Sequence, residues 1–196
     1  MSPDDQEEIN DAIRESIRRA RGYADFFGWG PNRDLEEQGV VVSLAESLEA
    51  DGLLFFSAIA IRGRGNDPPD LEAIDSTGNR VAFEVTELVD GQAIQTFKNG
   101  RTYDFAEWGQ DKFLSTLGAL LVAKSDRFHK LKGAPYSGGY VIVVFTDEMA
   151  LPRPTVEAYL RGHVFPGLNN VYRAFLVLSY DPAVERCPYF ELAKDG

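Results

Sequence analysis

Two carboxylates on either side of a short turn are the side chains of this sequence that are best spaced for chemistry. They are Asp70 and Glu84, and the residues Ser76-Thr77-Gly78 lie between them. A glycine at the third position suits a three-residue hairpin loop, because Gly78 adopts the left-handed conformation easily. Counting outward from that loop places Asp70 directly opposite Glu84. We therefore expect the two carboxylates on neighbouring strands.

Opposite residues of an antiparallel pair point to the same face, with their Cβ atoms ~5 Å apart. Two carboxylates at that separation repel each other unless a cation lies between them. Mg²⁺ is a suitable cation, because it takes a few hard oxygen ligands and otherwise keeps water and substrate phosphate. Such an ion polarises a phosphodiester and lowers the pKa of a bound water. The alternative is a solvated hairpin end, since a register shift of one residue separates the two acids.

The strands of this hairpin are expected over residues 71–75 and 80–88. Within the second strand Val81, Phe83 and Val85 alternate with Glu84, so they point to the opposite face. That face is expected to be buried in the core, while the acids line an open end of the hairpin.

The rest of the chain predicts a mixed α/β sheet with helices on both faces. Apolar residues at helical spacing indicate the helices, and short apolar runs indicate the strands. Residues 89–109 are expected to form an irregular excursion. The remaining expected elements are helices at 33–50, 111–132 and 154–161, and strands at 53–61 (buried on both faces), 140–145 and 171–179.

The segment Pro69-Asp70, the hairpin and Glu84-Val85-Thr86 together resemble the PD-(D/E)XK signature of restriction-endonuclease-like proteins. The order of helix, three strands, helix and strand is similar to that core as well, over about residues 35–148. The resemblance implies a restriction-endonuclease-like fold. It also implies hydrolysis of phosphodiester bonds in DNA or RNA that depends on Mg²⁺ or Mn²⁺. In that hypothesis Asp70 and Glu84 are metal ligands, with the Val85 carbonyl as a third oxygen.

The resemblance also suggests further site residues. The family usually has a glutamate on the helix before the first strand, and Glu46 stands in that place, with Glu49 one turn later as the alternative. The family's lysine position is occupied by Thr86. In some members a lysine of the following helix replaces it, and Lys124 and Lys130 are the candidates. Lys124 shares the apolar stripe of its helix, so its ammonium is expected to point toward the sheet.

Composition narrows the functional classes. The net charge is −11 and the pI is about 4.6, which disfavours general duplex binding but allows a small basic patch. One cysteine excludes an internal disulfide and favours the cytoplasm, and no apolar run reaches the ~20 residues of a membrane helix. The charge and Thr86 also favour an alternative, a catalytically inactive nuclease-like domain that acts as a protein-interaction or regulatory module.

Two parts are expected along the chain. Residues 1–32 form an N-terminal helical arm with an apolar stripe of Ile9, Ile13 and Ile17. Residues 33–196 form a single domain. The arm packs either on this domain or against a second subunit, which would make a homodimer.

Two further groups of side chains suit nucleic acid. Arg62 and Arg64 can clamp phosphate, or they belong to a solvated loop. The excursion combines cations with aromatic rings, which can stack on nucleotides or simply pack a long loop. Its members are Lys98, Arg101, Tyr103 and Trp108.

Overall fold

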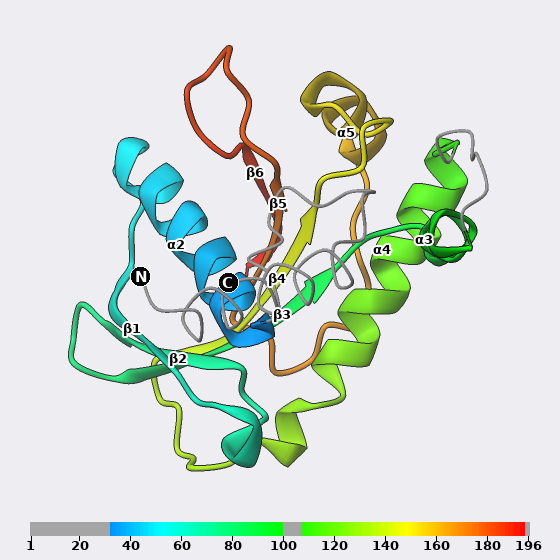
Figure 1. The fold of residues 1–196 in the computed structure, drawn as a ribbon. Coiled ribbons are helices and arrows are strands. Elements are labelled where there is room, and N and C mark those ends of the chain that lie inside the picture. Colours follow the sequence, from blue (N-terminus) through cyan, green and yellow to red (C-terminus); the bar gives the residue numbers. More distant parts are fainter. Residues whose placement is uncertain (1–31, 100–106, 195–196) are drawn as a thin grey trace, which may run out of the picture.

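The structure is a computed structural model that describes residues 32–99 and 107–194 (Figure 1). Six strands form one sheet in chain order: β1 (Phe56–Ile61), β2 (Leu71–Asp75), β3 (Arg80–Glu87), β4 (Gly139–Thr146), β5 (Arg173–Leu178) and β6 (Tyr189–Lys194). The helices are α2 (Arg33–Ala50), α3 (Gly91–Lys98), α4 (Gln110–Ser125) and α5 (Arg153–Leu160), with the 3₁₀ turns η1 (Arg64–Asn66) and η2 (Phe128–Lys130). The expected arm lies outside the described residues, apart from Asn32, which caps α2.

The sheet is mixed, as the sequence predicts. Strands β1, β2 and β3 are antiparallel, β3, β4 and β5 are parallel, and β6 returns antiparallel to β5. The two parallel connections each pass through helical segments, as parallel neighbours require. The predicted α/β class is therefore confirmed.

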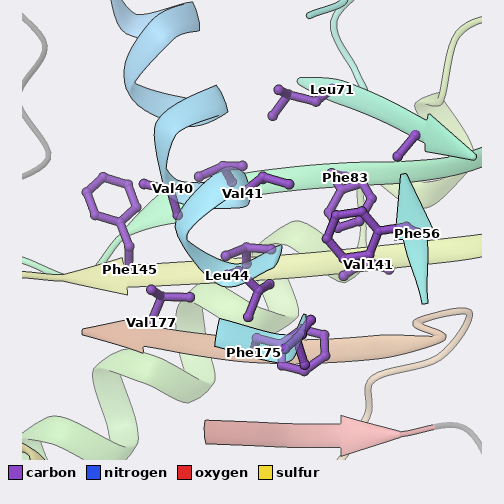
Figure 2. Close-up of a cluster of buried hydrophobic side chains, with 14 of the residues drawn as sticks. Val40, Val41, Leu44, Phe56, Leu71, Phe83, Val141, Phe145, Phe175 and Val177 are labelled. Carbon is purple, nitrogen blue, oxygen red and sulfur yellow. The ribbon is translucent and has the colours of Figure 1, made fainter. Parts of the chain in front are cut away.

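Helices cover both faces of this sheet. On one face, α2 packs its apolar stripe against the inward side chains of the strands (Figure 2). The stripe contributes Val40, Val41 and Leu44, which lie beside Phe83 and Val141. None of these side chains has exposed surface, so α2 is fixed on the sheet by burial of apolar area.

On the other face, α4 and α5 pack against the alternate side chains of the central strands. Phe113, Leu117 and Leu121 repeat every four residues on α4 and are fully buried. They join Ile142 and Val144 of β4 in one apolar cluster. This packing fixes which side of α4 faces the sheet. Lys124 is the next buried residue on that side.

The hairpin between β2 and β3 has the predicted register. Asp75 donates its N–H to the Asn79 carbonyl at 2.9 Å, and Gly78 has a φ of +87°. The pairing continues to Leu71 opposite Phe83. Counting one residue further places Asp70 opposite Glu84, as the sequence predicts.

Three expectations about the elements are wrong. The segment 53–61 was expected to be buried on both faces, but β1 starts only at Phe56 and is an edge strand with mostly exposed side chains. The irregular excursion contains α3, and the helix expected to reach residue 132 ends at Ser125. An apolar run does not distinguish an edge strand from a central one, because its neighbours in the sheet come from distant sequence.

The final strand was also missed: β6 follows a turn at residues 182–185, and its sequence mixes apolar and charged residues. None of the described helices is both long enough and apolar enough to span a bilayer.

Candidate metal centre

Three carboxylates converge beside the end of the hairpin. One oxygen each from Asp67, Asp70 and Glu84 lies within 4.8 Å of the other two. Asp67 and Asp70 come from the segment that enters β2, and Glu84 comes from β3. The Asp70 main chain is held on both sides: its N–H donates to Phe83, and its carbonyl accepts from Arg62 at 3.1 Å. Asp70 is therefore fixed at the point where the β2–β3 ladder ends.

The side chain of Asp70 is oriented by the backbone of β3. Its Oδ2 accepts the Val85 N–H at 2.8 Å. In a strand the N–H and C=O of one residue point to the same side. The Val85 carbonyl therefore faces the side of β3 from which β2 has already departed. That orientation is compatible with the predicted role of this carbonyl as a metal ligand, which remains a prediction.

Glu84 is completely buried. Its Oε2 lies 2.6 Å from Lys124 Nζ and 3.3 Å from Arg127 Nη1. Its Oε1 has no hydrogen-bond partner among the described residues. A buried acceptor without a partner costs about 1–3 kcal/mol. The second oxygen of Glu84 is thus available to a cation in the cluster.

The surroundings of Glu84 also change its acidity. Burial and the nearby Asp70 charge raise the pKa of Glu84 from 4.5 to about 7, and Lys124 and Arg127 limit that rise. A carboxyl that titrates near neutrality gains much from a bound cation, because the cation replaces the proton as the neutralising charge. The electrostatics of the site therefore favour a metal ion over a proton at high pH.

Lys124 extends from the last turn of α4 into this cluster. Its side chain is only 10% exposed, and Nζ lies 3.5 Å from Asp70 Oδ2 as well as close to Glu84. The Tyr140 hydroxyl donates to the Lys124 carbonyl at 2.6 Å and ties this turn to β4. The structure therefore brings the predicted helix lysine to the acids. Lys130 lies in η2, is exposed, and forms no ion pair with the described acids.

The expectation that Glu46 joins the acids is not met, and Glu49 is exposed as well. Glu46 is exposed, and its charge acts on the Cys187 thiol at another part of the fold. Glu37 lies nine residues earlier on α2, or about 13 Å along the helix axis, and the charge of Asp70 acts on it. The acid at the site thus comes from the first half of the helix.

Burial and the charge of Asp70 raise the pKa of Glu37 to about 7, while Arg33, at 2.7 Å from its Oε1, opposes the rise. A signal for this residue was present in the sequence. Glu37 precedes Val41 by four residues and Val40 by three, so it belongs to the buried stripe of α2. An acid in an apolar stripe was the same kind of signal that identified Lys124.

Sequence reasoning missed Asp67 and Arg127. The Arg127 guanidinium forms an ion pair with Asp67 through Nη2 while Nη1 approaches Glu84. Asp67 is the most open of the three acids, with 42% of its side chain exposed. Arg127 follows the end of α4, in a segment where the sequence predicted that the helix continued, and so its direction was not foreseen.

A pocket of about 270 Å³ opens beside the acids. Its lining includes Glu37, Asp67 and Asp70, together with Arg33, Asp34 and Gly63. Arg62 does not line it, because its guanidinium turns to Glu72 and to the Lys132 carbonyl. The pocket provides a route from solvent to the carboxylates.

Of the four side chains in residues 89–109 that were candidates for nucleotide stacking, the structure describes Trp108. Trp108 is 5% exposed and belongs to the apolar cluster under α4, with Lys112 Nζ 4.5 Å from the centre of its ring. Its role is therefore packing. Arg101 and Tyr103 lie outside the described residues, as does the side chain of Lys98.

The donor set fits a hard divalent cation. All three converging side chains offer carboxylate oxygens, which Mg²⁺ and Mn²⁺ prefer, and one oxygen of Glu84 lacks a partner. The cluster has three acids against the two cations Lys124 and Arg127. An acidic site that can hold a metal ion is the result. Comparisons of this chain with models of protein families, with curated proteins and with solved structures found no match in any of the three.

Proposed function

We propose that this chain is a nuclease that uses Mg²⁺ or Mn²⁺ to hydrolyse phosphodiester bonds in DNA or RNA. The observation that carries the proposal is the position of the Lys124 ammonium between the carboxylates of Asp70 and Glu84, beside a solvent-accessible pocket. A site that only binds a metal ion does not need a lysine ammonium beside its carboxylate ligands. A phosphoryl-transfer site does, because negative charge develops on the substrate. The PD-(D/E)XK-like motif of the hairpin supports the same reaction.

Each residue has a role that follows from its surroundings. Asp70, Glu84 and Asp67 would hold the metal ion, with the Val85 carbonyl as a further ligand. When bound, the ion polarises the phosphodiester and lowers the pKa of a water molecule. The Val85 N–H keeps Asp70 in one orientation. Lys124 stabilises the attacking hydroxide or the negative charge that accumulates on the phosphorus oxygens.

The test is cleavage of single- and double-stranded DNA and RNA with and without Mg²⁺ or Mn²⁺. We expect metal-dependent cleavage by the unmodified protein and its loss in Asp70→Asn and Glu84→Gln. Glu46→Gln is the matched control, because this acid is exposed and outside the cluster. If the unmodified protein and Asp70→Asn cleaved equally, the cleavage would not come from the acid cluster but from a contaminant. That result would contradict the proposal.

One observation favours a second candidate, a nuclease-like domain that binds a partner without catalysis. Lys124 and Arg127 already form ion pairs with Glu84, and Arg127 also pairs with Asp67, so much of the acidic charge is balanced within the protein. This candidate predicts no heat of binding when Mn²⁺ is titrated into the protein. Mn²⁺ binding that disappears in Glu84→Gln would count against it.

A further inference from the structure

A group of exposed and half-buried cations borders the acid cluster of this strongly acidic chain. We call it the basic rim, and its members are Arg62, Arg80, Lys130 and Lys132. The stretch 124–132 contains four lysines and arginines but only one acid, Asp126, whereas the whole chain has a net charge of −11. The rim is therefore a group of positive side chains on a protein whose net charge is strongly negative.

The rim combines two segments that are distant in sequence. Lys132 donates its N–H to the Pro68 carbonyl at 2.7 Å, and its Nζ donates to the Gly65 carbonyl at 3.3 Å. Arg62 Nη2 donates in return to the Lys132 carbonyl at 3.2 Å. Figure 1 shows η1 and η2 side by side at the lower end of the sheet. Pro68 lies between Asp67 and Asp70, so the rim is joined directly to the acid-bearing segment.

The charge of the rim is largely unbalanced. Glu72 Oε2 pairs with both Arg62, at 3.1 Å, and Arg80, at 2.5 Å. Among the described residues, neither Lys130 nor Lys132 forms an ion pair, and both are exposed. Two arginines of the rim therefore share one carboxylate, while the two lysines are exposed to solvent.

The backbone near the rim is shaped to let these side chains approach. Gly133 has a φ of +76°, and a Cβ at this position would lie 2.8 Å from Arg62 Nη2. Its carbonyl accepts from Arg80 Nη1 at 2.5 Å, and the Arg80 guanidinium lies over the Tyr136 ring. The two arginines are therefore held in place by the loop, while the two lysines are exposed and accessible to a ligand.

We propose that the basic rim binds the phosphate backbone of a nucleic-acid strand and delivers it to the acid cluster. The delivery rests on the proposed nuclease function, but the binding does not. A polynucleotide fits because it presents several negative charges at regular spacing, and separate cations along a surface match that pattern better than a single small anion. With four cations the contact spans only a few phosphates, so binding is weak and strongly salt-dependent.

The test is binding of a fluorescent single-stranded DNA oligonucleotide, measured by anisotropy in EDTA so that no cleavage occurs. The rim variant is Lys130→Gln/Lys132→Gln. The matched control is Arg153→Gln/Arg161→Gln, which removes the same charge from exposed positions at α5, at the opposite end of the molecule (Figure 1). We expect about tenfold weaker binding in the rim variant at low salt, and a salt slope shallower by about 1.4, since each lost phosphate contact on a single strand accounts for about 0.7. The control should bind like the unmodified protein.

Two results would overturn the rim: an equal loss of binding in both double variants, or no binding of single-stranded DNA, RNA or duplex by the unmodified protein. Metal-dependent hydrolysis of a small chromogenic phosphodiester separates this outcome from the nuclease proposal, because that substrate needs only the acid cluster. Hydrolysis without oligonucleotide binding refutes the rim and supports the nuclease. Binding through the rim without hydrolysis of any substrate supports the rim and contradicts the nuclease.

Discussion

Lys124 Nζ lies 2.6 Å from Glu84 Oε2, although the two residues are forty positions apart and belong to a helix and a strand. The same nitrogen is 3.5 Å from Asp70 Oδ2. The ammonium at the acids therefore comes from a helix, while Thr86 occupies the strand position where the motif that this chain resembles has a lysine. This arrangement allows the cation and the carboxylates to be altered separately.

Replacement of Lys124 by methionine keeps an unbranched chain that is one atom shorter and removes the charge. We expect cleavage to fall at least about 100-fold, the usual cost of losing one group that stabilises transition-state charge. Binding of Mn²⁺ should persist, because all the carboxylates remain. Single-turnover cleavage and calorimetry measure the two effects. Lys112→Met is the control, because this lysine of the same helix pairs with Asp90 and not with the acid cluster. An equal loss of cleavage in both variants would exclude a special role for Lys124.

The stability of the metal-free protein should depend on pH in an unusual direction. Burial and the Asp70 charge raise the pKa of Glu84 from 4.5 to about 7, so between these values the folded state binds more protons than the unfolded state. The free energy of unfolding therefore decreases as the pH rises through this window. The predicted loss is on the order of 3 kcal/mol for a shift of this size.

Urea unfolding in EDTA at about pH 4.5 and pH 8 measures this loss. Carboxyls with a lowered pKa, such as Asp90, whose hydrogen bonds and Lys112 pairing outweigh its burial, titrate below this window. Glu84→Gln should reduce the pH dependence by about half, because the amide does not titrate, while Glu37, whose pKa is also raised to about 7, still does. The same slope in this variant and in the unmodified protein would assign the effect to other groups.

Two glutamates on α2 form a natural pair for comparison. Glu37 is buried near Asp70, and Glu46 is exposed at the other end of the helix. We expect Glu37→Gln to weaken Mn²⁺ binding about tenfold at pH 8, where the carboxylate is ionised and attracts the ion. Glu46→Gln should leave the affinity unchanged. Calorimetry on both variants checks this, and equal affinities would remove Glu37 from the site.

Arg127 should have the opposite effect on metal binding. Its guanidinium pairs with Asp67 and approaches Glu84 at 3.3 Å, so it competes with a metal ion for both acids. Arg127→Ala is expected to strengthen Mn²⁺ binding by about tenfold at pH 8, because a positive charge near the ion is removed. Weaker binding in this variant would show that Arg127 instead orients the carboxylates for the metal.

The parts of the fold that could be predicted are those specified by local sequence. Gly78 and the three-residue loop determine the register that sets Asp70 opposite Glu84. The stripe of α4 determines that Lys124 faces the sheet. Both inferences need only the period of one element and its turn, and the structure confirms both.

The parts that could not be predicted depend on how elements cross. Which turn of α2 passes the hairpin end decides between Glu37 and Glu46, and no local pattern contains that angle. The end of α4 at Ser125 likewise decides where Arg127 points. The one usable sequence signal for Glu37 was its position in the apolar stripe of α2. The resemblance favoured Glu46 instead, because the family that the chain resembles usually has a glutamate at that place.

Because the Lys124 ammonium and the carboxylates belong to different elements, heating should affect them at different temperatures. Asp70 and Glu84 are held by the strand ladder, whereas Lys124 depends on the last turn of α4 and on one hydrogen bond from Tyr140. Helix ends open at lower free energy than central strands. Warming should therefore open the last turn of α4 and move the Lys124 ammonium away while Asp70 and Glu84 keep their positions. Thermal inactivation should then occur below the temperature of global unfolding, and cooling should reverse it.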